Sequence, residues 1–90
     1  MGYSYKQKFN RLHGQPKDQP NSILEISNLS GYQHKGLTMI FLKGKGAFYS
    51  NPQSVRKSVI SPEQWGYSRI YSAVMGGKAA EIDKDLLIKI

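Results

Sequence analysis

The longest run of apolar residues in the chain lies at Leu37–Leu42, where only Thr38 interrupts it. Lys43-Gly44-Lys45-Gly46 follows this run, and residues 47–50 then return to a less polar pattern. A short apolar run bounded by glycines is typical of a buried strand, and glycine supplies the positive φ that a tight turn needs. The pattern therefore predicts a β-hairpin around residues 37–50, with Leu37–Leu42 as its central strand.

A second apolar segment precedes this hairpin at residues 23–29 and contains two isoleucines and two leucines. The segment stops at Ser30-Gly31, a dipeptide that is common in turns. Runs of this length that include β-branched side chains are typical of strands, so we expect a short strand near 23–29. On the other side, Asn51-Pro52 ends the hairpin, because proline has no N–H group to donate to a ladder.

The clearest local pattern begins at Ser61, whose hydroxyl is a strong helix N-cap. Pro62 suits the first helical position, and Gln64 stands three residues after Ser61, as a capping box requires. Ile60 and Trp65 occupy the two positions of a hydrophobic staple. These start signals agree with one another and predict a helix over residues 62–75.

Gly76-Gly77 ends this predicted helix near Met75, because glycine readily adopts the left-handed conformation that follows a last helical turn. At about 100° per residue, one broad face should pack on the sheet and carries Gly66, Tyr67, Ile70, Tyr71, Ala73 and Val74. Gly66 on that face suggests a close approach of the helix to a strand. The opposite face carries Trp65 and Arg69. Trp65 either packs on Ile60 as the second staple residue, or it forms a recognition surface together with Arg69, whose guanidinium can stack on the indole.

These elements together predict an α+β fold, in which a small antiparallel β-sheet packs against one main helix. The sheet comprises the hairpin around 37–50 and the strand near 23–29, and the helix is 62–75. Residues 79–90 fit two alternatives, because Ile82, Leu86 and Ile90 have helical spacing whereas residues 87–90 also fit a strand.

Residues 1–21 lack sustained apolar periodicity and contain Gly14, Pro16 and Pro20, so we expect an extended arm. The arm interleaves aromatic and basic residues, which either bind another surface or belong to a floppy terminus. The candidate partner-binding residues of this arm are Tyr3, Tyr5, Lys6, Lys8, Phe9 and Arg11. Residues 22–90 then form one small domain, because a chain of 90 residues is too short for two.

The charge of the chain is strongly positive, with 13 Lys and Arg against 6 Asp and Glu, a net of +7. The excess lies in the first two thirds of the sequence. A clustered positive field favours a polyanionic partner, either nucleic acid or an acidic protein surface, although the same charge also serves solubility. The candidate basic patch lies in and after the expected hairpin and consists of Lys43, Lys45, Arg56 and Lys57.

Signatures of catalysis and of metal binding are missing from the sequence. The chain has no cysteine, which removes disulfides, thiolate metal sites and cysteine nucleophiles together. His13 and His34 are the only histidines, and neither joins a recognisable triad. Asp83 and Asp85 either cap a turn or face the basic hairpin, and two carboxylates on a loop indicate a metal only weakly. We therefore expect no enzyme activity, no cofactor and no metal.

The chain also lacks the sequence features of membrane and exported proteins. No stretch approaches the roughly 18 consecutive apolar residues of a membrane-spanning helix. The first thirty residues lack the apolar run of a signal peptide. We therefore expect no membrane partner and no secretion.

Residues 61–86 contain a pattern of four parts, which are Ser61-Pro62-Glu63-Gln64-Trp65, Arg69, Gly76-Gly77-Lys78-Ala79 and Asp83-Lys84-Asp85-Leu86. This pattern resembles an uncharacterised domain of bacteriophage and large-virus proteins. In that domain Ser-Pro-x-x-Trp opens an Arg-containing helix, followed by a Gly-Gly-Lys-Ala turn and an Asp-x-Asp-Leu segment. The resemblance does not extend to residues 1–47. It brings no chemistry with it, but it implies a viral setting.

The expected function is that of a small basic bacteriophage protein. We expect a non-enzymatic virion structural or assembly accessory component that docks on other virion proteins. Two alternatives stay open: a nucleic-acid-binding module that uses the basic patch and the arm, and a phage-encoded inhibitor of a host protein. All three place the chain in a virion or in the host cytoplasm.

Overall fold

The computed structural model describes residues 4–50 and 61–90, and these two stretches are helical. The elements are α1 (Tyr5–Leu12), α2 (Ile23–Ser30), α3 (His34–Ser50), α4 (Pro62–Val74), α5 (Lys78–Ile82) and a 3₁₀ turn, η2 (Lys84–Leu86). The described residues contain no β-sheet, and their only strand-like pairing is one isolated antiparallel bridge between Tyr32 and Lys89. The predicted α+β fold is therefore wrong, and the described part of the chain is all-α.

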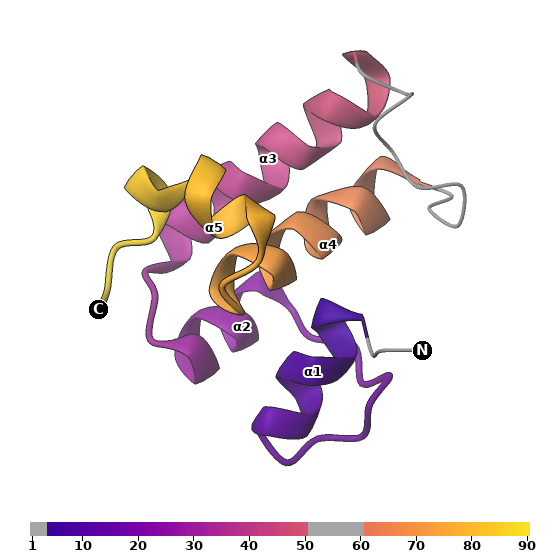
Figure 1. Cartoon of the computed structure of the whole chain (residues 1–90), viewed down its shortest axis with the longest axis vertical. Coiled ribbons are helices and arrows are strands. Elements are labelled where there is room, and N and C mark those ends of the chain that lie inside the picture. Colours follow the sequence, from indigo (N-terminus) through magenta and orange to yellow (C-terminus); the bar gives the residue numbers. More distant parts are fainter. Residues whose placement is uncertain (1–3, 51–60) are drawn as a thin grey trace.

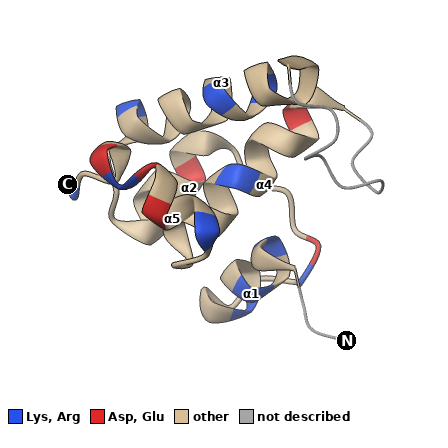
Figure 2. Ribbon diagram, turned by 45° about the horizontal axis from the view of Figure 1, so that its top comes forward, with Lys and Arg blue, Asp and Glu red and all other residues tan. Residues whose placement is uncertain are grey.

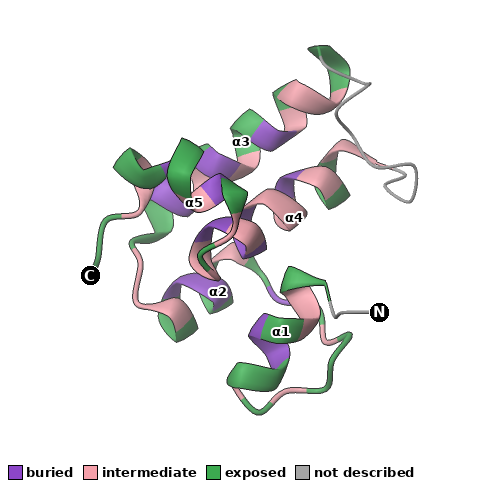
Figure 3. Ribbon diagram, in the orientation of Figure 1, coloured by how far each residue is buried: buried purple, intermediate pink, exposed green. Residues whose placement is uncertain are grey.

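Helix α4 is the centre of the arrangement (Figure 1). It packs most extensively on α3, and α1 and α5 also contact it, while α2 packs on α3. Figure 3 shows where buried residues lie along these helices. The hydrophobic core is formed by Phe9, Ile26, Leu37, Ile40, Ile70, Tyr71, Ala73 and Ala79. One core thus joins residues from each of the α-helices in the described part of the chain.

The segment predicted as a hairpin is helix α3, which runs without a break through Lys43-Gly44-Lys45-Gly46. Its buried residues include Leu37, Ile40 and Gly44, which recur at intervals of three and four residues. That spacing places one face of the helix on the core. The glycines that suggested a turn therefore lie inside a helix, and the predicted hairpin with its central strand is wrong.

The segment predicted as a strand near 23–29 is helix α2. The Ser22 hydroxyl accepts from the Glu25 backbone N–H at 3.1 Å, and a Glu25 carboxylate oxygen accepts from the Ser22 N–H at 3.0 Å. This capping box pairs N–H groups that the first turn leaves without helical partners. Gly31 then ends the helix in the left-handed conformation, with φ of 80°.

The predicted helix 62–75 is confirmed by α4, which spans Pro62–Val74 and has Met75 as its C-cap. Ser61 is the N-cap, and its hydroxyl accepts from the Gln64 N–H at 3.0 Å. Gly76 has φ of 76°, so the left-handed residue falls where the sequence predicts it. Ile60, the other half of the predicted staple, lies outside the described residues.

Helices α3 and α4 cross where two glycines meet. A Cβ built on Gly44 would lie 2.7 Å from the Gly66 Cα, and a Cβ on Gly66 would lie 2.7 Å from the Phe41 ring. Both positions lack a side chain because the backbones are too close to admit one. Gly66 thus marks a close approach, as expected from the sequence, but the approach is to a helix.

The N-terminal segment is not the extended arm that the sequence predicts, because residues 5–12 form α1. Ser4 and Gln7 form a capping box at its start, and Phe9 is only 1% exposed in the core. The amide of buried Asn10 donates to the Lys17 and Gln19 carbonyls at 2.9 and 3.0 Å, which folds residues 13–20 back along α1.

A buried polar contact then ties this segment to α4. The amide of Asn21 donates to Asn10 Oδ1 at 2.8 Å and to the Tyr71 hydroxyl at 3.2 Å. Burial raises the pKa of Tyr71 above its ordinary value, and the hydrogen bond from Asn21 offsets part of that rise. The N-terminal segment therefore shares the core and the polar network of the rest of the chain.

Residues 79–90, for which the sequence left helix and strand open, contain helical turns up to Leu86 and no strand. They include most of α5 and the whole of η2, and Lys89 then pairs with Tyr32 in the isolated bridge. The Ile90 N–H also donates to the Gly31 carbonyl at 2.9 Å. The C-terminal residues thus pack beside the α2–α3 connection.

Ile70 lies at the centre of the α4 core face and is fully buried. We expect Ile70→Val to lower the free energy of unfolding by about 0.5–1.5 kcal/mol, because it deletes one buried methylene group. Ile88→Val is the matched control, since Ile88 is 53% exposed and should change stability by less than about 0.5 kcal/mol. Urea unfolding followed by circular dichroism measures both, and equal effects would contradict the burial of this face.

Candidate functional site

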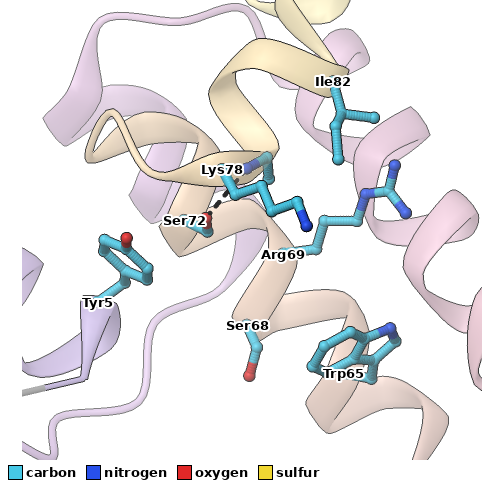
Figure 4. A pocket seen from close by; sticks show the side chains of 8 residues that line it. Tyr5, Trp65, Ser68, Arg69, Ser72, Lys78 and Ile82 are labelled. Atoms are coloured by element: carbon cyan, nitrogen blue, oxygen red, sulfur yellow. Dashed lines mark hydrogen bonds between the residues drawn. The ribbon is translucent and has the colours of Figure 1, made fainter. Parts of the chain in front are cut away.

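A surface pocket of about 210 Å³ opens between α1, α4 and α5. Its walls are mostly apolar, and its lining residues are Tyr5, Trp65, Ser68, Arg69, Ser72, Lys78, Ala79 and Ile82. Figure 4 shows Tyr5 reaching the pocket from α1 on one side, while Trp65 and Ile82 stand at the opposite side. We call this site the Trp65 pocket. The pocket thus brings α1 together with α4 and α5, which lie some 50 residues or more further along the chain.

Of the residues predicted as a helix surface, the structure brings both Trp65 and Arg69 into this pocket. Both extend from α4, as do Ser68 and Ser72, and all four line the pocket (Figure 4). These four residues lie on the face that the helical periodicity separates from the core. The structure thereby places the predicted recognition pair at a concave surface.

Behind the pocket, Arg69 is held by a buried carboxylate. Asp83, the C-cap of α5, has a side chain that is 0% exposed. It accepts from Arg69 Nε at 2.7 Å and from Arg69 Nη2 at 3.0 Å. Lys43 Nζ of α3 donates to the same carboxylate at 2.6 Å. One carboxylate thus joins α3, α4 and the end of α5.

The ionisation of Asp83 is decided by these two cations. Burial alone raises the pKa of a carboxyl group, but the hydrogen bonds and charges of Arg69 and Lys43 outweigh it and lower the pKa of Asp83. Asp83 is therefore an anion at neutral pH. Two cations share its single negative charge, so this cluster keeps a net charge of about +1.

Hydrogen bonds to Ser72 tie the end of α4 to the start of α5 beside the pocket. The Ser72 hydroxyl accepts from the Ala79 N–H at 3.2 Å, and the Ser72 carbonyl accepts from the Gly77 N–H at 2.7 Å. A Cβ on Gly77 would lie 2.6 Å from both Ser72 Oγ and the Tyr5 hydroxyl, so the absence of a side chain at Gly77 lets the Tyr5 ring lie close to this connection. These contacts fix the pocket walls relative to one another.

The predicted basic patch is only partly described. Lys43 makes the ion pair with Asp83, and Lys45 lies over the Phe41 ring, with 5.5 Å from Nζ to the ring centroid. Arg56 and Lys57 lie outside the described residues. The Lys and Arg positions of the described segments are distributed over several helices (Figure 2) rather than gathered on one of them.

The predicted arm residues lie in different places. Phe9 belongs to the core and is not available to a partner, whereas Tyr5 lines the pocket. Lys8 Nζ lies over the Tyr5 ring, 5.3 Å from its centroid, and so brings a cation to that side of the pocket. Lys6 is half-buried, Arg11 is exposed, and Tyr3 lies outside the described residues.

Sequence reasoning missed Lys78 and Ile82 as pocket residues and Asp83 as the partner of Arg69. The sequence left open whether Asp83 and Asp85 cap a turn or face the basic hairpin. Asp83 stands between α5 and η2, but its side chain makes no capping hydrogen bond and instead pairs with Lys43, which lies in a helix rather than in a hairpin. Within residues 4–50 and 61–90, no group of His, Asp and Glu is arranged to hold a metal ion. In the same residues, no helix has the length and apolar character needed to cross a membrane.

Comparisons of the chain with protein-family models, curated proteins and solved structures found no match. The resemblance to the uncharacterised viral domain is therefore still a prediction. The structure does show where the residues of that pattern lie. Four of them line the Trp65 pocket, namely Trp65, Arg69, Lys78 and Ala79, and Asp83 binds the Arg69 guanidinium from behind.

Proposed function

We propose that this chain is a small non-enzymatic bacteriophage protein, a structural or assembly accessory component that docks on other virion proteins. The viral setting rests on the resemblance over residues 61–86. The docking role rests on the Trp65 pocket, a preformed concave surface outside the core.

The composition of this pocket favours binding over catalysis. Its lining combines apolar walls with two cations and two serine hydroxyls. Arg69 is bound to Asp83, and the Ser72 hydroxyl accepts from a backbone N–H. A side chain of another protein would be held in such a site by packing and by charge.

The test is mass spectrometry of purified particles of the virus that encodes the chain. A virion component is expected at a fixed number of copies per particle. This copy number should stay the same after the particles are purified through a second density gradient. A protein found only in the soluble fraction of infected cells would contradict the virion role. It would instead favour the inhibitor of a host protein.

Nucleic-acid binding is a second candidate, because the N-terminal segment carries Lys6, Lys8, Arg11 and Lys17 against Asp18 alone. If these side chains contact four phosphates of a duplex, the slope of log K against log salt concentration should be roughly −3 to −4. Under the docking proposal we expect no measurable affinity for a 20-base-pair duplex at moderate salt. Fluorescence anisotropy at low and moderate salt measures the difference.

A further inference from the structure

We propose that the Trp65 pocket binds an acidic peptide segment of a partner protein. An apolar side chain of that segment would enter between Trp65, Ala79 and Ile82, and a neighbouring carboxylate would pair with Lys78. This inference rests on the proposed docking function and specifies the surface and the chemistry of its partner.

The size of the pocket suits one side chain better than a cofactor. Small-molecule and cofactor sites usually enclose roughly 300–1,000 Å³, whereas this pocket encloses about 210 Å³. The pocket is also only partly enclosed, so the backbone of a bound segment has room to run across its mouth. A single large apolar residue in an otherwise extended segment matches both features.

The charge around the pocket favours an anionic neighbour for that side chain. Lys78 is exposed and makes no ion pair within the described residues, although Glu81 stands three residues further along α5. Lys8 adds a second cation at the Tyr5 side. None of the lining residues is acidic. The site therefore presents positive charge beside an apolar wall, which complements a segment that alternates apolar and acidic residues.

The pocket is also preorganised, which lowers the entropic penalty of binding. The bidentate contact of Asp83 fixes the Arg69 side chain. The Ser72 contacts fix the α4–α5 connection, and the Tyr5 ring lies against Gly77 of that connection. A ligand then meets walls that need little rearrangement.

Nucleic acid fits this site less well. A single strand is held by several cations that follow its backbone, together with aromatic rings on which its bases stack. Here Asp83 offsets one of the two positive charges of Arg69 and Lys43, and the two further cations, Lys78 and Lys8, belong to different helices instead of forming one row. Nucleic-acid binding at this pocket is therefore the outcome that would overturn the peptide proposal.

Trp65 provides a direct readout, because the chain contains one tryptophan. The probe is a synthetic twelve-residue peptide with a central phenylalanine flanked by glutamates. Two control peptides replace the phenylalanine with glycine or the glutamates with lysines. We expect a saturable change in Trp65 emission with the first peptide and none with either control at the same concentrations.

Lys78→Glu is the critical variant, and Lys84→Glu is its matched control. Both residues are exposed, both changes alter the net charge equally, and only Lys78 lines the pocket. We expect Lys78→Glu to lower the affinity for the acidic peptide by about fivefold or more, since it replaces an attraction with a repulsion. Lys84→Glu should lower this affinity less than twofold. Circular dichroism verifies that both variants are folded.

Three results would overturn the proposal: no saturable emission change at millimolar peptide, equal weakening by the two variants, or tighter Lys78-dependent binding of a twelve-base oligonucleotide. Failure of the peptide test with the protein still present in particles would mean that docking uses another surface. Absence from particles together with peptide binding would instead remove the virion role and leave the pocket assignment standing.

Discussion

Replacing Asp83 with asparagine is expected to lower the free energy of unfolding by about 1–3 kcal/mol. The substitution removes the negative charge that Lys43 and Arg69 share; the Asp83 side chain is 0% exposed, whereas the side chains of Lys43 and Arg69 are 46% and 18% exposed. Neutralising one partner of a fully buried ion pair typically costs about 3–5 kcal/mol, and solvent at the two cations reduces the loss here. Small domains are stable by only about 5–15 kcal/mol, so the loss would be a large part of the total. Urea unfolding followed by circular dichroism measures it.

The matched control is Asp85→Asn, in the same turn. Asp85 is exposed and takes part in no ion pair within the described residues, so its replacement should change stability by less than about 0.5 kcal/mol. Similar losses for the two variants would show that the effect comes from net charge. In that case the carboxylate would have no special role in joining α3, α4 and α5.

Asp83 also makes the stability depend on pH in a defined direction. Burial raises its pKa, but the Arg69 and Lys43 contacts outweigh burial and bring the pKa below 3.8. A carboxyl group with a lowered native pKa stabilises the fold above its unfolded pKa and loses that contribution as the pH falls toward the native one. The wild-type chain should therefore lose stability more steeply below about pH 4 than Asp83→Asn. Urea midpoints at several acidic pH values test this.

The sequence predicts α4 well because its start and end signals are local. Ser61 and Gly76 act through hydrogen bonds and φ values of their own backbone neighbourhood, whatever surrounds them. The same local logic applies to α1 and α2, whose capping boxes pair Ser4 with Gln7 and Ser22 with Glu25. Both capping boxes can be recognised in the sequence, and they favour helices where we predicted an extended arm and a strand.

Helix α3 was harder to predict, because its apolar run Leu37–Leu42 fits a buried strand and a buried helix equally well. The decisive fact is the position of Gly44 against Gly66, a contact between residues far apart in the chain. Propensity disfavours glycine inside a helix by about 1 kcal/mol relative to alanine. Tertiary packing overrides that preference here, and no local pattern contains this information.

The candidate site could be predicted only where it depends on one helix. Periodicity places Trp65 and Arg69 on the same side of α4, and the structure confirms that arrangement. Tyr5 reaches them from α1, and Asp83 joins Lys43 across forty residues of sequence. Such contacts depend on how the helices pack, so the pocket itself was not visible in the sequence.

Substitutions at the α3–α4 crossing should disrupt the fold in proportion to their size. A Cβ at Gly44 would lie 2.7 Å from the Gly66 Cα, which is backbone and cannot rotate away. We expect Gly44→Ala to destabilise the chain by about 1–3 kcal/mol through overpacking, even though alanine is the better helix former. Gly44→Leu should lower the free energy of unfolding by more than about 3 kcal/mol, because α3 and α4 cannot stay in contact around a leucine side chain.

Gly46 supplies the control in the same helix, two residues further on. It is exposed, and a Cβ there would have no atom within 4 Å. Gly46→Ala should therefore stabilise the chain by up to about 1 kcal/mol, through helix propensity and a less flexible unfolded state. Opposite signs at Gly44 and Gly46 are the expected result in urea unfolding. Stabilisation at both positions would mean that α3 and α4 do not cross closely at Gly44, and that Gly66 requires another explanation.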